Sequence, residues 1–216
     1  IESLEGEGLP IKWDESYGAR LGVMPRTGGD SDVTWYDIDP CYVYHPLNAY
    51  EDGDDIVLDV CRLANMIADG IDTPAFMTRW VINRSSGNVK ETQIDDRNTE
   101  FPRLPDTLVG QKHRYGYAAG LAASAPYGER YIKYDFGDFS AKTLELGPGR
   151  QGSEAVFVAD PSGSSEDDGW LLAYVYDQST DCSEVLILDA STLSEAARVL
   201  LPARVPMGFH GSWVPA

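Results

Sequence analysis

The chain has 216 residues, 43% of them hydrophobic and 24% charged, which is the composition of a folded domain and excludes a disordered tail or linker. It contains 17 lysines and arginines and 35 aspartates and glutamates. The resulting formal charge of -18 would repel nucleic acid phosphates and anionic lipid headgroups. We therefore expect no nucleic-acid partner, and the dispersed acidic residues are typical of a solvated surface.

The cysteines argue for a reducing environment. Cys41, Cys61 and Cys182 are an odd set without C-x-x-C spacing, which speaks against a disulfide framework and against a structural zinc site. No run approaches the roughly 20 apolar residues that a membrane-spanning helix needs. The sequence therefore predicts a cytoplasmic protein without a transmembrane segment.

Short runs rich in β-branched and aromatic residues recur along the chain and have the length of strands. In chain order they lie at residues 33–38, 41–44, 56–61, 76–82, 89–94, 115–119, 131–135, 155–158, 170–176, 184–188, 197–201 and 209–214. Turn-forming residues at 83–88 and 164–169 predict hairpin connections. The only helix-like stretch, residues 192–197, is too short to be stable without tertiary support. The sequence predicts an all-β fold, and its strand spacing allows a sandwich, a barrel or a propeller.

Four stretches carry a resemblance to a known family, and they occur in that family's order. The first spans residues 17–51, where His45 ends an apolar run and is followed by Asn48 and Ala49. The others are residues 99–103, 154–172 and 206–211. From Leu9 to Val214 the chain resembles the C-terminal half of carotenoid cleavage oxygenases, a family of carotenoid and lignostilbene dioxygenases and proteins like the retinal pigment epithelial membrane protein.

The resemblance implies a seven-bladed β-propeller, with residues 1–216 as the C-terminal part of that single domain. It also implies a non-haem Fe(2+) bound by four histidines, two of which, with the first of three orienting glutamates, would lie N-terminal to this sequence. We therefore expect a missing N-terminal half or a companion chain. Because half a propeller would expose sheet edges and carry half a site, we expect this chain to be inactive alone.

His45 and His210 match two of the metal ligands of the family. Without the resemblance, His45 reads more readily as a core residue and His210, flanked by glycines, as a turn residue. A metal-bound imidazole usually donates its other N–H to a carboxylate, and two glutamates match that role. By the resemblance, Glu100 should orient His45 and Glu154 should orient His210, although either would otherwise read as a surface carboxylate.

Other candidate ligands are set aside. His113 lies between Lys112 and Arg114, whose charges disfavour a nearby dication, and the matching position in the family is not a ligand. Asp167 and Asp168 lie in a stretch that lacks the alternating oxygen ligands of a calcium loop. We interpret that stretch as a turn.

The resemblance implies oxidative cleavage of a C=C bond in an apolar conjugated substrate, an apocarotenoid or a stilbene, with O2 at iron and two carbonyl products. No nucleophile elbow or phosphate-binding glycine loop competes with this hypothesis, and no catalytic residue beyond the metal site is invoked. Two alternatives stay open. A relative within the family is an isomerohydrolase that couples ester cleavage to isomerisation, and the chain could instead be a non-catalytic propeller piece that binds a partner.

Overall fold

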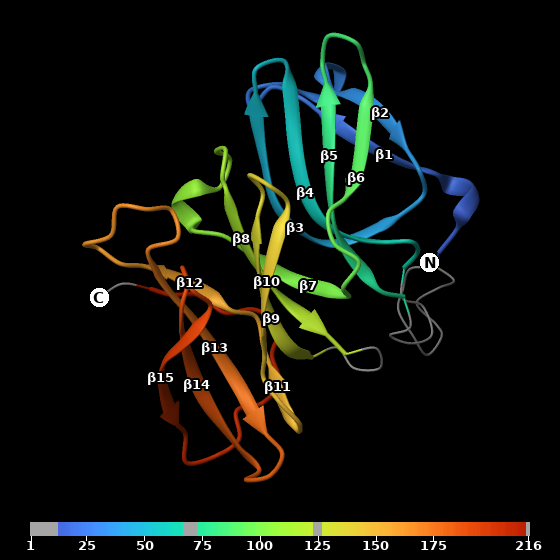
Figure 1. Cartoon of the computed structure of the whole chain (residues 1–216). Helices are drawn as coiled ribbons and strands as arrows, with labels where there is room; N and C mark the ends of the chain where they lie inside the picture. Colours follow the sequence, from blue (N-terminus) through green and yellow to red (C-terminus); the bar gives the residue numbers. More distant parts are fainter. Residues whose placement is uncertain (1–12, 67–72, 123–126, 215–216) are drawn as a thin grey trace.

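The computed structural model describes residues 13–66, 73–122 and 127–214, and nearly all regular structure within them is β-strand (Figure 1). The strands are labelled β1 to β15 in chain order. Short 3₁₀ helices interrupt them at η2 (Glu15–Tyr17), η3 (Asp30–Asp32) and η4 (Asp106–Leu108). The predicted all-β fold is confirmed.

The first strands form two separate sheets. Near the N-terminal end, β1 (Ala19–Val23) and β2 (Thr34–Ile38) pair with each other in an antiparallel sheet. A four-stranded antiparallel meander follows, in the order β3 (Tyr42–Asp52), β4 (Asp55–Leu63), β5 (Ala75–Asn83) and β6 (Val89–Gln93). The predicted turn at residues 83–88 joins β5 to β6, so that hairpin is confirmed.

Two further meanders share one larger sheet. The second meander consists of β7 (Thr99–Arg103), β8 (Tyr115–Leu121), β9 (Gly128–Asp135) and β10 (Ser140–Glu145). The third consists of β12 (Val156–Ala159), β13 (Gly169–Asp177), β14 (Cys182–Asp189) and β15 (Ser194–Leu200). The short strand β11 (Arg150–Gly152) pairs with both β9 and β13, and in Figure 1 the second meander lies between the other two.

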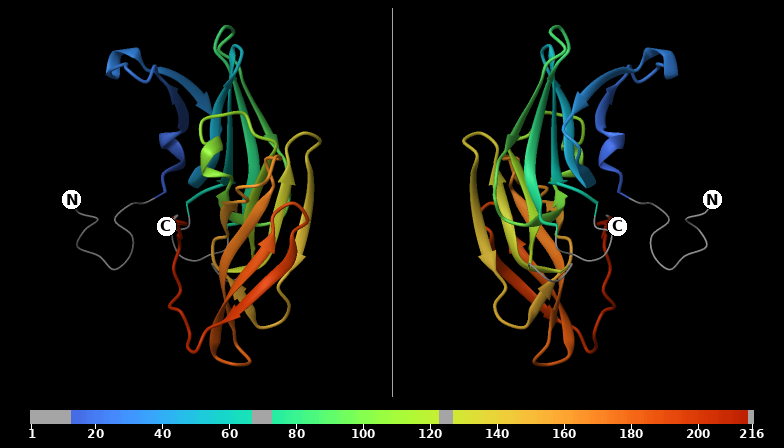
Figure 2. Two further views of the ribbon diagram at one scale, coloured as in Figure 1. Left: turned by 90° about the vertical axis from the view of Figure 1, so that its left-hand side faces the viewer. Right: turned by 90° about the vertical axis from the view of Figure 1, so that its right-hand side faces the viewer.

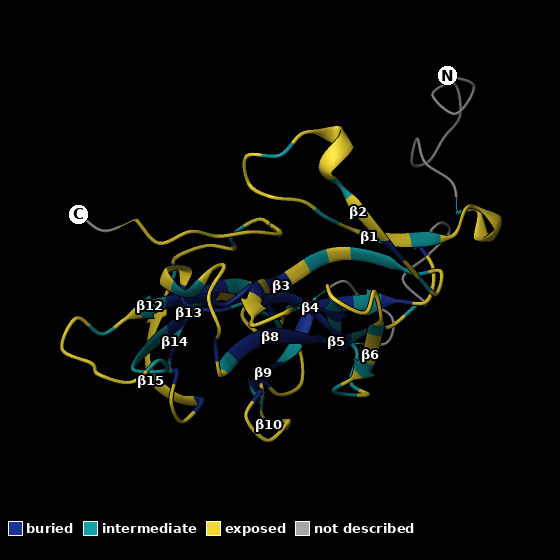
Figure 3. Ribbon diagram, turned by 90° about the horizontal axis from the view of Figure 1, so that it is seen from above, coloured by how far each residue is buried: buried dark blue, intermediate teal, exposed yellow. Residues whose placement is uncertain are grey.

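The core lies between neighbouring meanders. One cluster of buried side chains, which includes Met77 and Tyr134, joins the first meander to the second. Another cluster, which includes Leu171, joins the second meander to the third. Strand β8 contributes to both, because successive side chains point to opposite faces of a strand: Ala118 belongs to the first cluster and Ala119 to the second. Figure 3 shows these buried positions running through the middle of the molecule.

The segment after β15 returns along the third meander as an extended chain without a strand partner in the described part of the molecule. Figure 2 shows it running on the side that also carries β1 and β2. Val205 donates its backbone N–H to the Ser183 hydroxyl at 3.0 Å, and Gly211 donates to the Glu154 carboxylate at 2.9 Å. The strand predicted at 209–214 is therefore wrong for this chain, since a strand needs a neighbour to pair with.

The helix-like stretch at 192–197 does not form a helix. The Asp189 carboxylate accepts hydrogen bonds from Ser191 and Thr192 and closes a turn, and Leu193 takes a left-handed φ of 52°. The chain then pairs with β14 as β15. The hairpin predicted at 164–169 is confirmed by the pairing of β12 with β13, whereas β1, β7, β10 and β11 are strands that the sequence does not predict.

Two smaller expectations concern cysteines and membranes. All three cysteines are free thiols, as predicted. In the described ranges, no helix has the length and apolar character to cross a membrane.

Candidate metal centre

His45 lies on β3 at a point where the strand is irregular. The pairing of β3 with β4 shifts register between Val43 and Pro46 and again between Pro46 and Asn48. Pro46 has no N–H to give to a ladder, which favours such a break. His45 lies within this break, and its Nδ1 lies 2.6 Å from Oε2 of Glu100.

Glu100 is the second residue of β7, and only 6% of it is exposed. Its Oε2 accepts from His45 Nδ1 and also from the backbone N–H of Phe101 at 2.9 Å. The hydrogen bond to Glu100 raises the pKa of His45 above its usual value, and burial opposes that shift. Glu100 therefore holds the His45 ring with its Nδ1 side toward the protein.

His210 has a matching arrangement on the C-terminal segment. Its Nδ1 lies 3.3 Å from Oε1 of Glu154, which precedes β12, and the N–H of Gly211 donates to Oε2 of the same carboxylate at 2.9 Å. The Glu154 side chain is 4% exposed, while the His210 ring is 55% exposed. The segment is thus fixed at the carboxylate, and its imidazole remains open on one side.

The two imidazoles face each other through their other nitrogens. Nε2 of His45 lies 3.2 Å from Nε2 of His210, although 165 positions separate them in the chain. When Nδ1 donates its proton to a carboxylate, Nε2 of a neutral ring carries a lone pair. Two nitrogens that each lie about 2.1 Å from one ion are themselves about 3.0 to 3.4 Å apart at octahedral or tetrahedral angles. The pair therefore fits two neighbouring ligands of one metal ion.

Aromatic and apolar groups surround the pair. The ring of Phe101 lies 5.3 Å from that of His45 and 6.1 Å from that of His210, and Phe209 packs against Phe101. A cavity of about 500 Å³ opens beside Glu154 and His210. Its apolar lining includes Val156, Leu172, Tyr174, Met207, Phe209 and Trp213. The cavity can therefore receive an apolar molecule beside His210.

His113 lies in a different environment. It is buried, its Nδ1 lies 3.1 Å from the amide nitrogen of Asn48, and its Nε2 lies 3.5 Å from a carboxylate oxygen of Asp59. The structure does not bring it to the His45 and His210 pair. Across the described ranges, no three or more histidine, cysteine, aspartate or glutamate side chains gather as a metal cluster.

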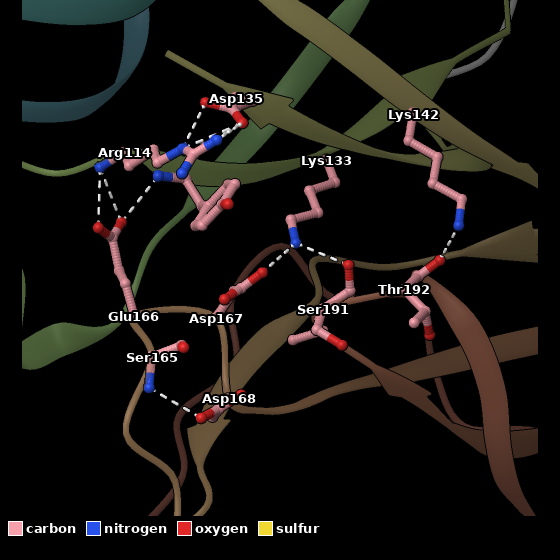
Figure 4. Close-up of polar contacts among 12 residues, drawn as sticks. Arg114, Lys133, Asp135, Lys142, Ser165, Glu166, Asp167, Asp168, Ser191 and Thr192 are labelled. Atoms are coloured by element: carbon pink, nitrogen blue, oxygen red, sulfur yellow. Dashed lines mark hydrogen bonds and ion pairs between the residues drawn. The ribbon is translucent and has the colours of Figure 1, made fainter. Parts of the chain in front are cut away.

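Both carboxylates of the turn that contains Asp167 and Asp168 accept hydrogen bonds from other groups of the protein, as Figure 4 shows. Asp167 accepts from the ammonium group of Lys133, which also donates to the backbone oxygen of Ser191. Asp168 accepts the backbone N–H groups of Ser164 and Ser165. These contacts fasten the loop between β12 and β13.

Two residues at the site, Phe101 and Arg103, were not predicted from the sequence as site residues. Phe101 adopts a left-handed φ of 55°, which is uncommon outside glycine, and Arg103 lies 3.9 Å from Oε1 of Glu154. The available signal was Pro102, because a proline inside a strand indicates an edge or a bulge. Their positions result from that local irregularity.

Three four-stranded meanders, with a pair of carboxylate-supported imidazoles beside them, are the arrangement expected of part of a β-propeller. The chain matches the family described as retinal pigment epithelial membrane protein over residues 2–215. It is 45% identical to a carotenoid cleavage oxygenase of Mycobacterium tuberculosis, covering 96% of this chain and 44% of that protein. It is 34% identical to a carotenoid 9,10(9',10')-cleavage dioxygenase of Crocus sativus, covering 99% of this chain and 44% of that protein.

The chain therefore belongs to the retinal pigment epithelial membrane protein family, as the sequence predicts. Among solved structures, it is similar to the cobalt-substituted apocarotenoid oxygenase of Synechocystis, with a TM-score of 0.84 and 28% identity. That match covers 92% of this chain and 44% of the other, so the fold is part of a β-propeller. The chain spans a little under half the length of these relatives.

Proposed function

We propose that this chain supplies half of the metal site of an Fe(2+) oxygenase that cleaves a C=C bond of an apocarotenoid, with O2 as co-substrate and two carbonyl products. The observation that carries the proposal is the 3.2 Å approach of the two Nε2 atoms, each ring being backed by a carboxylate. When bound, non-haem iron supplies the activation of O2. Family membership supports oxygenase chemistry on carotenoids, and a stilbene substrate is the alternative within this activity.

In this proposal, His45 and His210 hold the iron through Nε2. Glu100 and Glu154 keep Nδ1 of each ring protonated and the rings oriented, which raises the basicity of the ligating nitrogens. The open side of His210, 55% exposed, is where the two further histidines expected from the resemblance would approach. Neutral imidazole ligands leave the charge of the ion uncompensated, so outer carboxylates also balance it.

The apolar groups have a separate role in the proposal. Phe101 and Phe209 provide a wall beside the imidazoles, and Phe209 and His210 also line the cavity of about 500 Å³. Volumes of roughly 300 to 1,000 Å³ are usual for small-molecule sites, and apolar linings exclude water from them. An extended conjugated substrate matches that chemistry better than a charged one.

Activity belongs to the complete site, so we propose that the isolated chain is inactive. Two imidazoles give an ion fewer protein ligands than a closed metal centre has. The test uses the natural polypeptide that carries this sequence, purified with iron, with an apocarotenoid and ¹⁸O2. We expect label in both carbonyl products, and turnover without incorporation would favour the isomerohydrolase alternative.

The non-catalytic alternative needs a different measurement. Iron is quantified in the purified natural polypeptide and in its His45→Ala and His210→Ala variants. We expect close to one iron per polypeptide, lost in both variants. An iron-free polypeptide that remains unable to take up Fe(2+) would contradict the metal proposal and favour a binding role.

A further inference from the structure

Strand β7 carries groups that reach both halves of the imidazole pair. Glu100 contacts His45, and Arg103, three positions later, lies near the carboxylate that contacts His210. In a regular strand, residues three apart point to opposite faces of the sheet, because side chains alternate. The shared orientation of these two side chains therefore needs an explanation.

A β-bulge provides it. Glu100 pairs with Ala119 and Arg103 with Tyr117, so β7 advances by three residues while β8 advances by two. The extra residue in β7 shifts by one the alternation of side chains between the two faces of the sheet. Arg103 therefore takes the orientation that the second residue after Glu100 would have in a regular strand. The bulge turns Arg103 toward the same side as Glu100.

The bulge is fixed by Phe101 and Pro102. Phe101 has a φ of 55° and donates its N–H to the Glu100 carboxylate, and Pro102 has no N–H to give to the ladder. A left-handed conformation is strained for a residue with a side chain, because Cβ comes too close to the following carbonyl oxygen. Such strain persists only where the surroundings hold it, and it is often found at functional sites.

Arg103 lies between two carboxylates of different burial. Its Nη1 is 3.9 Å from Oε1 of Glu154, whose side chain is 4% exposed, and its Nη2 is 3.6 Å from Oδ1 of Asp106, whose side chain is 76% exposed. A buried carboxylate needs a compensating cation or several hydrogen bonds, whereas an exposed one is solvated by water. The contact with Glu154 is thus the one with consequences for the site.

We propose that Arg103 is a positioning residue of the metal centre, which holds Glu154 in place and through it His210. The inference rests on the proposed function, because it assumes that His210 binds a metal. In this proposal, residues of β7 align both imidazoles. Glu100 aligns His45 directly, and Arg103 aligns His210 by holding Glu154. Arg103 itself contacts neither the metal nor the substrate.

The test replaces Arg103 by methionine in the natural polypeptide and measures Co²⁺ binding to the iron-free protein by visible absorption. Outer groups that contact a ligand change metal affinity by about 10- to 100-fold, so a residue one step further out should lower it roughly 3- to 10-fold. We also expect altered Co²⁺ absorption bands, because His210 would be held less firmly. Arg103→Lys keeps a cation and should recover most of the affinity.

Arg130→Met is the matched control. Arg130 lies on β9, has a side chain 27% exposed against 24% for Arg103, and pairs with Glu145 at 3.2 Å. We expect it to leave Co²⁺ affinity and spectrum unchanged. If Arg103→Met proves unfolded by its thermal transition, Arg103→Gln, which keeps a polar end, takes its place in the same comparison.

The outcomes separate this inference from the proposed function. If the unsubstituted protein binds no Co²⁺ through His45 and His210, the proposed function fails and this inference fails with it. If the unsubstituted protein binds Co²⁺, and the folded Arg103→Met or Arg103→Gln protein binds it with the same affinity and the same spectrum, only this inference is overturned. An equal loss in Arg130→Met would overturn it as well, because the effect would then be a general one of charge.

Discussion

Replacing Glu100 with glutamine is a direct test of the support given to His45. Glutamine has nearly the same shape, but it exchanges one carboxylate oxygen for an NH2 group and removes the negative charge. In the native site, Oε2 accepts two hydrogen bonds, from His45 Nδ1 and from the N–H of Phe101. The amide oxygen can continue to accept both, so the geometry should survive while the charge is lost.

Two magnitudes follow from this change. A hydrogen bond to a charged acceptor contributes about 1.5 to 3 kcal/mol and a neutral one about 0.5 to 1.5, so the bond that orients His45 loses roughly 1 to 1.5 kcal/mol. At about 1.4 kcal/mol per factor of ten, metal affinity should fall roughly 5- to 12-fold. The other carboxylate oxygen, Oε1, is buried without a hydrogen-bond partner among the described residues, so an NH2 group there would leave donors unsatisfied. We therefore expect a loss of about 1 to 3 kcal/mol in folding stability as well.

The assay combines iron content after purification, Co²⁺ titration of the iron-free protein and urea unfolding. Glu51→Gln is the control, because that glutamate is 72% exposed and forms a surface pair with Arg84 at 3.4 Å. We expect the control to match the unsubstituted protein in every measurement. A folded Glu100→Gln protein with unchanged iron content and unchanged Co²⁺ affinity would refute the role assigned to Glu100.

Further predictions concern the remaining histidines and one buried ion pair. His210→Ala should abolish retention of iron while His113→Ala should retain it, as measured by metal analysis; loss in both would show that His113 supports the site. Burial lowers the pKa of His113 from 6.5, so the unfolded chain takes up the proton first as the pH falls. The contribution of neutral, buried His113 to the free energy of unfolding should therefore be fully present above about pH 6.5 and decrease below it. In urea unfolding between pH 5 and 8, His113→Gln should weaken this pH dependence. Asp59 is fully buried and binds Arg79 through both oxygens at 2.7 and 2.8 Å, so Asp59→Asn should cost about 3 to 5 kcal/mol of stability; a loss below 1 kcal/mol would contradict that estimate.

The strands with strong apolar patterns could be predicted from the sequence, and the irregular ones could not. β4 and β5 contain long β-branched and aromatic runs that are buried between meanders, so composition and position agree. β7 contains Pro102 and the charged residues Glu100 and Arg103, and the sequence predicts only the second half of β15, which is exposed along its whole length. These strands form because neighbouring strands pair with them, and the local propensity of a sequence contains no information on such pairing.

The candidate site shows the same division. The approach of His45 to His210 spans 165 positions and depends on the packing of three meanders, so spacing alone did not indicate it. The family resemblance singled out these histidines and both glutamates, and the structure brings the four together. Arg103 was outside that set because its orientation depends on a bulge, and a change of strand alternation cannot be read from a sequence that lacks its partner strand.

The candidate site, with the left-handed Phe101 and the exposed His210, lies near the starts of strands that contribute residues to the buried core. Glu100 is the second residue of β7 and Glu154 precedes β12, so both carboxylates enter where the first strand of a meander begins. One buried cluster includes Phe101 and Ala155, each next to one of these glutamates, whereas His45 and His210 belong to neither buried cluster. Substitutions of His45 and His210 should therefore remove the metal and spare the fold, whereas a change in the β7 bulge reaches both, because Phe101 belongs to the core and contacts both imidazoles. In the proposed metal centre, the bulge is thus the point where stability and the alignment of the imidazoles would be coupled, and measuring unfolding and metal affinity on the same variants separates the two effects.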